Sequence, residues 1–210
     1  MSTRDDSNDR PRRPRDQRRL RLIPARPEHA ALWHRWRGEA DSQRFNPLYE
    51  LTVEELARRL KILGEGDISD RRRTDYRWMV ECGAEVIGTV SAMNISWGMG
   101  YVEIGYMFGA EHHGRGLGTR AVALLVDKLF GETALHRVYA TVSVENHASI
   151  RLLERLGFRR EGVMREHYLI QGRRVDEIIY GLLRHEWEAR PFNPTAGISE
   201  PRSDHSNEPR

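Results

Sequence analysis

The sequence contains a single cysteine, Cys82, and no apolar run that approaches the roughly 20 residues of a membrane span. One cysteine cannot build a disulfide framework, and its apolar neighbours in a predicted strand indicate a buried thiol. The N-terminus also lacks the apolar core of a secretory signal peptide. These absences exclude the disulfide-rich secreted class and the membrane-spanning class, so we expect a cytoplasmic protein with no membrane partner.

Lysine is nearly absent, because only Lys61 and Lys128 occur among the 34 Lys and Arg residues. Arginine carries almost all of the positive charge, which indicates a GC-rich genome rather than a binding function. Many arginines lie in residues 1–18, a polar stretch that cannot bury enough apolar surface to order itself. Aspartates interleave with these arginines, so we favour a solvated tail and do not expect a nucleic-acid partner. We predict one domain at residues 19–188, between disordered tails at 1–18 and 189–210.

Histidine is the remaining source of metal ligands, and its distribution does not predict a metal site. The nine histidines are scattered without the two-histidine spacing that a helix needs to hold zinc. His112 and His113 are adjacent, but they lie in a loop. We therefore expect no metal.

Hydrophobic periodicity divides residues 19–188 into strands and helices in mixed order. We expect strands at 20–23, 76–82, 86–95, 101–108, 137–144, 158–169 and 175–183, and helices at 28–37, 52–63, from Thr119 to about 130, and from Asn146 to Gly157. The strand–helix–strand unit makes the strands at 101–108 and 137–144 parallel neighbours. The predicted fold class is α/β, a mixed and mostly antiparallel seven-stranded sheet flanked by about four helices.

Residues 109–118 contain four glycines in ten positions, between a strand and a helix. Backbone N–H groups of such a loop, together with the helix dipole, bind anions such as phosphate. The alternative is a flexible surface loop. Thr119-Arg120 lacks the lysine of nucleotide-triphosphatase loops. Residues 116–121 satisfy the dinucleotide fingerprint, but that fold places its first glycine at the strand end, whereas Gly116 lies well beyond Phe108.

Residues His113 to Gly118 read His-Gly-Arg-Gly-Leu-Gly and resemble motif A of the GNAT acetyltransferases, Gln/Arg-x-x-Gly-x-Gly/Ala. His113 departs from the usual first residue. Two further segments follow in register: residues 146–158 resemble the next helix of the family with its closing Gly-Phe. Residues 176–183 resemble the last strand of the branch that contains the RimJ and RimL ribosomal-protein N-terminal acetyltransferases. The resemblance covers residues 19–188 and implies a GNAT fold, acyltransferase activity and acetyl-CoA as co-substrate.

The resemblance also assigns residues. In this family the strands corresponding to 101–108 and 137–144 separate, and the pantetheine arm lies between them. It implies that the cofactor-binding residues are Met107, Phe108, His113, Gly114, Arg115, Gly116, Leu117, Gly118, Thr119, Asn146 and Ser149. The connection between the first two helices walls the acceptor site in the family. We therefore assign substrate-binding roles to Arg44, Phe45, Asn46 and Tyr180.

An attacking amine must be neutral, and an α-amine with a pKa near 8 meets this condition more readily than a lysine amine near 10.4. Glu103 is the candidate general base, because it is a carboxylate within an otherwise apolar and aromatic strand. The alternative is a carboxylate on the solvent face. Many family members place a tyrosine acid where Leu153 stands, which leaves Tyr106 and Tyr180 as weak substitutes.

The predicted function is acetyl transfer from acetyl-CoA to a primary amine, with a protein or peptide N-terminus as the expected acceptor. The segment 35–49 carries Arg35, Arg37 and Arg44 against Glu39 and Asp41, so it offers no net negative charge for a polycation. Convergence of Glu161, Glu166, Asp176 or Glu177 would change this balance. The alternatives are an aminoglycoside or polyamine acetyltransferase, and a non-catalytic CoA-binding or RNA-associated module. The sequence leaves homodimerisation open.

Overall fold

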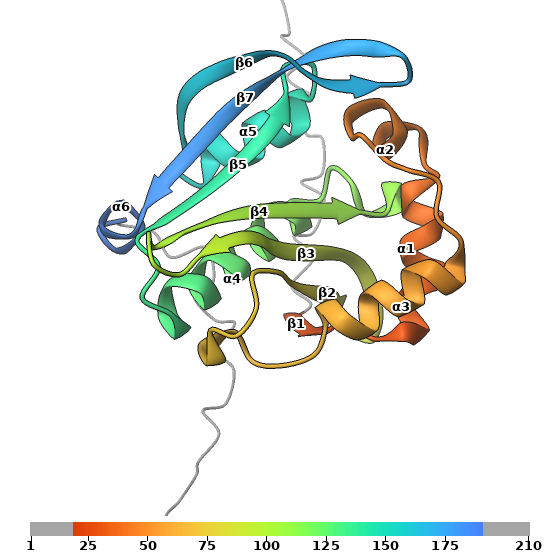
Figure 1. Cartoon of the computed structure of the whole chain (residues 1–210), viewed down its shortest axis with the longest axis horizontal. Coiled ribbons are helices and arrows are strands. Elements are labelled where there is room, and N and C mark those ends of the chain that lie inside the picture. The colour runs from red at the N-terminus through yellow and green to blue at the C-terminus, as the bar shows by residue number, and fades with distance from the viewer. Residues whose placement is uncertain (1–18, 191–210) are drawn as a thin grey trace, which may run out of the picture.

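Seven strands form one mixed sheet in the computed structural model, which describes residues 19–190 (Figure 1). The strands are β1 (Leu20–Pro24), β2 (Tyr76–Cys82), β3 (Glu85–Ser96), β4 (Tyr101–Phe108), β5 (Arg137–Ser143), β6 (Arg159–Ile170) and β7 (Arg173–Leu183). The α-helices are α1 (Ala30–Arg37), α2 (Ala40–Phe45), α3 (Val53–Leu63), α4 (Leu117–Glu132), α5 (His147–Arg155) and α6 (Arg184–Glu188). The predicted tails lie outside the described residues, except for Ala189 and Arg190.

The strand order is β1-β2-β3-β4-β5-β7-β6, and every neighbouring pair except β4–β5 is antiparallel. The parallel pairing of β4 with β5 runs only from Tyr101 opposite Arg137 to Glu103 opposite Tyr139. Both strands continue beyond these residues without pairing to each other. The predicted seven-stranded, mostly antiparallel α/β fold is therefore confirmed, and its sheet opens between the two central strands.

The described residues form six α-helices rather than about four. Two of them, α2 and α6, are single short turns of five or six residues, too short to show helical periodicity in a sequence. Helix α2 occupies part of the stretch expected to be an aromatic loop. Helix α4 begins at Leu117 rather than at Thr119, because Gly116 adopts a left-handed conformation (φ 75°) and serves as the N-cap residue.

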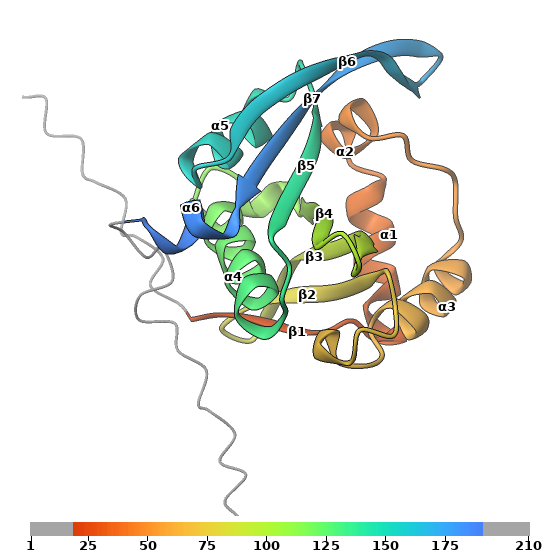
Figure 2. The ribbon, with the colours of Figure 1, turned by 60° about the vertical axis from the view of Figure 1, so that its left-hand side comes forward.

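The two faces of the sheet are covered by different helices (Figure 2). On one face α4 and α5 pack through Leu125, Leu129 and Leu153 against the larger core. On the other face α1 and α3 form a smaller core around Trp33 and Trp36. Helix α3 begins with a capping box, in which Thr52 and Glu55 each bind the other's backbone N–H. Cys82 is buried, also as predicted.

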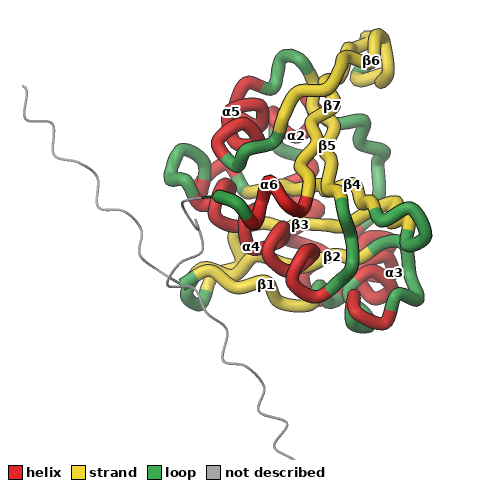
Figure 3. The backbone as a smooth tube through the Cα atoms, turned by 90° about the vertical axis from the view of Figure 1, so that its left-hand side faces the viewer, coloured by secondary structure: helices red, strands yellow, loops and turns green. Residues whose placement is uncertain are grey.

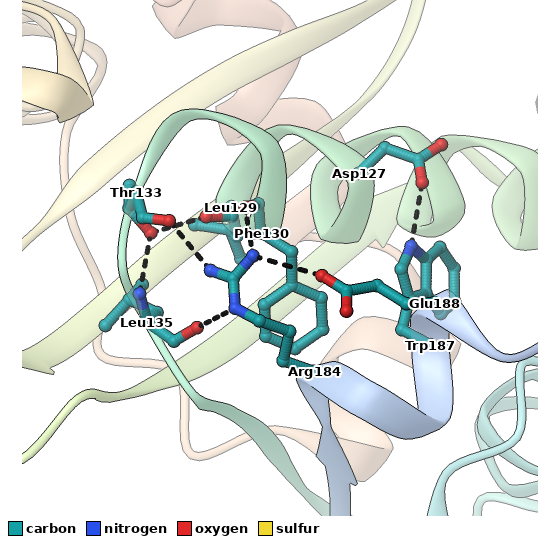
Figure 4. Close-up of polar contacts among 8 residues, drawn as sticks. All are labelled: Asp127, Leu129, Phe130, Thr133, Leu135, Arg184, Trp187 and Glu188. Carbon is teal, nitrogen blue, oxygen red and sulfur yellow. Dashed lines mark hydrogen bonds and ion pairs between the residues drawn. The ribbon is translucent and has the colours of Figure 1, made fainter.

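The C-terminal end of α4 is held by α6 (Figure 4). The Arg184 guanidinium donates hydrogen bonds to the carbonyl oxygens of Phe130 (2.5 Å), Thr133 (2.7 Å) and Leu135 (2.8 Å). Trp187 Nε1 donates to Asp127 Oδ1 at 2.8 Å. Carbonyl groups at a helix end lack partners within the helix, so this arginine satisfies them and fixes α4 against the sheet. The glycine loop lies at the opposite end of the same helix.

The β6–β7 hairpin projects beyond the rest of the sheet (Figure 3). Its register shifts between Met164 and Tyr168, where Glu166 has a φ of 52° and its N–H donates to Asp176 Oδ1 at 2.8 Å. Such a bulge bends a strand and redirects its side chains. Here it brings the rings of His167 and Tyr168 into a stack with centroids 4.4 Å apart.

Candidate active site

A cavity of about 440 Å³ lies between the C-terminal half of β4, the glycine loop and α5. Its lining includes every predicted cofactor-binding residue except Arg115, namely Met107, Phe108, His113, Gly114, Gly116, Leu117, Gly118, Thr119, Asn146 and Ser149. The cavity also receives Asp41, Ser42 and Phe45 from α2. The geometry thus brings the predicted set together around one hollow.

The glycine loop passes along the cavity with its backbone exposed. Gly114 and Gly116 have left-handed φ values of 72° and 75°, a conformation that other residues rarely adopt. A side chain on Gly118 would place its Cβ 3.2 Å from the Phe108 ring and 3.4 Å from Leu152. The first N–H groups of α4 point out of the helix N-terminus toward this loop, and such groups bind phosphate. The loop therefore fits an anionic ligand.

His113 has a structural use at the position where it departs from motif A. Its Nε2 lies 2.9 Å from the Phe108 carbonyl oxygen, and its Nδ1 lies 4.0 Å from Asp41 Oδ2. The imidazole thus ties the glycine loop to the end of β4 and to α2. The neighbouring His112 is buried, with Nε2 3.7 Å from carboxylate oxygens of Glu85 and Glu111.

One face of α5 lines the cavity, and the sequence assignment did not include it beyond Ser149. The face consists of Ala148, Arg151, Leu152 and Arg155. Their spacing of three, four and seven residues places them on one side of a helix, so this pattern was available in the sequence. Arg151 and Arg155 add positive charge to a cavity whose loop already favours anions.

The first turn of α5 meets β4 across the cavity. Asn146 Oδ1 accepts the Ser149 N–H at 3.1 Å, which is the predicted cap. The side chain of Ser149 is hydrogen-bonded to the Tyr106 hydroxyl. Burial raises the pKa of Tyr106, so its hydroxyl keeps its proton throughout the neutral range.

Glu103 does not line this cavity, because it lies on the opposite face of β4 from the buried residues Val102 and Ile104. Its carboxylate is half-buried and accepts hydrogen bonds from three side chains on the neighbouring strands. These are Asn94 Nδ2 at 2.9 Å, Thr141 Oγ1 at 3.3 Å and the Tyr139 hydroxyl at 3.4 Å. Glu103 is thus an oriented carboxylate at the point where β4 and β5 begin to separate.

A second carboxylate lies beside Glu103. Glu177 on β7 is only 2% exposed, is hydrogen-bonded to Thr141, and has its Oε2 3.4 Å from His167 Nδ1. Burial raises the pKa of Glu177, and the negative charge of Glu103 raises it further. We call Glu103, Thr141, His167 and Glu177 the carboxylate cluster. From the sequence, Glu177 was only one of four acidic residues whose convergence on the acceptor would matter. The cluster itself carries no sequence signal, because a β-bulge and a strand crossover bring its members together.

The other acidic groups considered with Glu177 have partners elsewhere. Glu161 pairs with Arg137, and this pairing holds the pKa of Glu161 below its usual value. Asp176 accepts the Glu166 N–H within the bulge. Of Glu161, Asp176 and Glu177, it is Glu177 that shares Thr141 with Glu103.

The predicted substrate-binding residues separate into three groups. Phe45 lines the cavity, and Asn46 bonds back to the Ser42 carbonyl oxygen at the end of α2. Arg44 pairs with Glu145 at 3.3 Å, and Glu145 also pairs with Arg173 of the β6–β7 hairpin at 3.5 Å. Tyr180 is corrected: it is 1% exposed and its hydroxyl donates to Glu154, so its side chain does not reach the cavity.

A comparison with protein-family models gives a match to the acetyltransferase (GNAT) domain over residues 19–159. The chain belongs to the GNAT acetyltransferase family. Members of this family take an acetyl group from acetyl-CoA, which agrees with the predicted enzyme class and co-substrate. It also agrees with the fold, in which the sheet opens between β4 and β5 beside a glycine loop.

Several relatives of this GNAT domain have assigned or proposed activities. The chain is 40% identical over 103 residues to the uncharacterized N-acetyltransferase p20 of Bacillus licheniformis, and the match covers 49% of this chain and 58% of that protein. It is 28% identical over 189 residues to the spermidine N(1)-acetyltransferase of Escherichia coli K12, with 90% of this chain and 94% of that protein covered. The first two curated relatives are matched over little more than half of their length, 58% and 55%.

Among solved structures, the ribosomal-protein-S5-alanine acetyltransferase of Vibrio fischeri matches with a TM-score of 0.69 and 26% identity. The match covers 80% of this chain and 93% of that one. Relatives of both the polyamine and the ribosomal-protein kind are therefore present, and similarity alone does not choose between them. Within residues 19–190, no helix is long and apolar enough to cross a membrane.

Proposed function

We propose that this GNAT domain transfers the acetyl group of acetyl-CoA to a primary amine that reaches the carboxylate cluster through the opening between β4 and β5. The observation that carries the proposal is the arrangement on the two sides of that opening. A loop and helix N-terminus suited to phosphate lie on one side, and an oriented carboxylate lies on the other. A thioester placed in the opening would meet both.

We assign the cofactor contacts to the residues that line the cavity. The amides of residues 114–119 bind the pyrophosphate, while Arg151 and Arg155 contribute charge to the same anion. Unpaired backbone groups of β4 beyond Glu103 pair with the amide groups of the pantetheine arm. Arg115 does not line the cavity and is assigned to long-range attraction of the phosphates.

Glu103 acts as the general base that removes a proton from the ammonium form of the acceptor. The neutral amine then attacks the thioester carbonyl, and the thiolate of CoA leaves. Tyr106 and Ser149 are the hydroxyl groups nearest this path on the cavity side, and we assign them to hydrogen bonds with the leaving sulfur. A thiol has an ordinary pKa near 8.5, so the thiolate needs only weak proton donation.

The expected acceptor is a protein or peptide N-terminus. Glu145, which follows β5, pairs with both Arg44 on α2 and Arg173 on the hairpin, so these three side chains together carry more positive than negative charge. One ammonium group can sit against the carboxylate cluster, but the remaining charges of a polyamine would lie near these arginines. A peptide with a neutral or acidic body meets no such repulsion.

A spermidine-type polyamine is the second candidate, because two observations favour it. Two carboxylates, Glu103 and Glu177, converge on the opening, and the spermidine acetyltransferase of Escherichia coli is similar over 90% of this chain. Pairing of Glu145 with the arginines is weak in solvent, so a polycation can compete for that carboxylate.

Release of CoA thiol from acetyl-CoA, measured with a panel of amines at pH 7, tests both candidates. We expect an alanine-initiated peptide with acidic residues after the first position to exceed spermidine and kanamycin in kcat/KM. The double substitution Arg44→Gln with Arg173→Gln should reduce the difference in kcat/KM between the peptide and the polycations, because it removes the two positive charges that pair with Glu145.

A preference for spermidine in the wild type would establish the second candidate. Acetyl-CoA binding without thiol release for any amine would instead establish a CoA-binding module. Arg35→Gln is the control, because Arg35 pairs with Glu111 at 2.5 Å rather than with Glu145.

A further inference from the structure

The carboxylate cluster continues from Glu103 to the protein surface. Thr141 Oγ1 lies 3.3 Å from Glu103 Oε1 and is also hydrogen-bonded to Glu177. Glu177 Oε2 lies 3.4 Å from His167 Nδ1, and the His167 side chain is 39% exposed. Four groups on four different strands thus form one chain of contacts, with a half-buried carboxylate at one end and an exposed imidazole at the other.

The reaction creates a need for such a path. An ammonium acceptor and acetyl-CoA yield an amide, CoA thiol and one proton, so each turnover leaves a proton on the base. Acetyl-CoA and the acceptor occupy the two sides of the opening next to Glu103 during the reaction. A base that is covered by both substrates loses its proton before the products leave only when the proton has another exit.

We infer that Thr141, Glu177 and His167 form a proton relay that returns Glu103 to its charged state after each turnover. This inference rests on the proposed function, and it assigns these three residues as positioning and relay groups rather than as catalytic residues. None of them needs to touch the substrate.

The proton balance along the relay is complete. Protonated Glu103 donates to Thr141 Oγ1 while the threonine hydroxyl proton passes to the Glu177 carboxylate. Glu177 then donates to Nδ1 of neutral His167, which forms an imidazolium ion. Loss of the Nε2 proton to water leaves a neutral ring with its proton on Nδ1. Proton exchange with water then returns the ring to the tautomer with its proton on Nε2. The net change is the transfer of one proton from Glu103 to solvent.

The groups around the relay allow this transfer. Burial raises the pKa of Glu177, so this carboxylate takes up a proton more readily than an exposed glutamate does. Tyr139 from β5 bonds to Glu103, and Tyr168 from β6 bonds to Thr141, but both phenols have raised pKa values and stay protonated. Asn94 from β3 is neutral, and Asp176 beside Glu177 is bonded to the Glu166 N–H.

The experiment compares the first turnover with steady-state turnover in the full-length protein. Replacement of His167 by glutamine keeps a hydrogen-bonding group but removes the titratable ring. Since the first turnover needs no prior return of Glu103 to its starting state, His167→Gln should leave the single-turnover rate within about twofold and lower steady-state kcat about tenfold. The progress curve then shows a burst, and added imidazole should restore kcat in His167→Ala.

Two further variants test the interior of the relay. Thr141→Val removes the hydroxyl at nearly constant volume, and it should produce the same burst without rescue by imidazole, because the break lies upstream of the ring. Glu166→Gln and His185→Gln are the matched controls: Glu166 is an exposed carboxylate on the same bulge, and the His185 ring on α6 lies 6.4 Å from that of His136.

Three results would overturn the relay. These are an unchanged kcat in His167→Gln, an equal fall of the single-turnover rate and kcat, or an absence of imidazole rescue in His167→Ala. Failure of the proposed function has a different signature, because the wild type itself would then release no thiol with any amine.

Discussion

The two sides of the opening between β4 and β5 use different kinds of chemical group. On the cavity side, the phosphate-binding groups are mainly backbone N–H groups of one short segment, the glycine loop and the first turn of α4, and α5 adds side chains. On the other side, the groups are side chains from four strands, and Glu103 and Glu177 are distant in the sequence. The first side depends on backbone shape, and the second depends on packing of the sheet.

This difference determines which substitutions each side tolerates. A backbone cradle depends little on the identity of its side chains, so His113 can stand at the first position of motif A, where its ring contacts the Phe108 carbonyl oxygen. The glycine loop loses its capacity to bind an anion when a side chain is added at a glycine position. The carboxylate cluster has the opposite sensitivity, because its function is lost when one functional group is exchanged at constant volume.

The largest effect is expected from Gly118→Glu. The new side chain would enter the cavity beside the Phe108 ring and bring negative charge to the place assigned to the pyrophosphate. We expect acetyl-CoA affinity to fall at least about 100-fold, since juxtaposed like charges cost several kcal/mol. The fold should persist, because an acidic residue near a helix N-terminus is favourable.

Isothermal titration with acetyl-CoA and a thermal unfolding curve check this prediction. Gly131→Glu is the matched control, because Gly131 lies at the other end of α4 with open space around it. An unchanged acetyl-CoA affinity in Gly118→Glu would show that the glycine loop does not bind the phosphates.

Glu103→Gln is the matching test of the other side. It removes the base but keeps the size of the side chain and an oxygen that accepts the Asn94 hydrogen bond. We expect kcat at pH 7 to fall about 100-fold with acetyl-CoA affinity changed by less than about twofold. The loss should shrink toward pH 9, where an α-amine with a pKa near 8 is already neutral.

Rates between pH 6 and 9 for both proteins, with calorimetric affinities, measure these effects. Glu132→Gln is the control, because Glu132 is exposed on α4 and pairs with Lys128 at 2.6 Å. Wild-type rates in Glu103→Gln would show that Glu103 is not the general base.

The contrast between the two sides also explains what the sequence could predict. Strands β2 and β4 were predicted with their observed bounds, since alternating apolar residues run to a turn at each end. The glycine loop was predicted because its information is local: glycines, a strand before them and a helix after them. The information that forms the Thr52 cap and the Gln171-Gly172 turn, where both residues have positive φ, is local in the same way.

The carboxylate cluster carries no comparable local signal. Glu177 appears in the sequence as a charged residue before an apolar run, which is typical of a strand end at the surface. Its burial follows from the bulge at Glu166, which brings His167 over it, and from the crossover that places β7 beside β5. Tyr180, which was assigned to the substrate, lies on the same strand as Glu177, but strand alternation directs it to the opposite face, toward α5.

The smallest expected effect is the contribution of Glu177, on the acceptor side, to the pH dependence of the free energy of unfolding. Burial raises the native pKa of Glu177 above the value near 4.3 of an unfolded glutamate. Between these two values the native state binds more protons than the unfolded state, so the contribution of Glu177 to stability is full below the unfolded pKa. It is lost as pH rises through the native pKa, with a slope of at most about 1.4 kcal/mol per pH unit.

Glutamine does not titrate, so Glu177→Gln should gain stability relative to the wild type as pH rises from about 4.5 to 8. Urea unfolding at several pH values measures the difference, and the exposed Glu166→Gln should follow the wild type throughout. Because the charge of Glu103 raises the pKa of Glu177, Glu103→Gln should narrow the pH window over which the difference develops. Parallel curves for Glu177→Gln and the wild type would show that Glu177 ionises as freely in the folded protein as in the unfolded chain, and the two carboxylates would then have to be treated as independent groups.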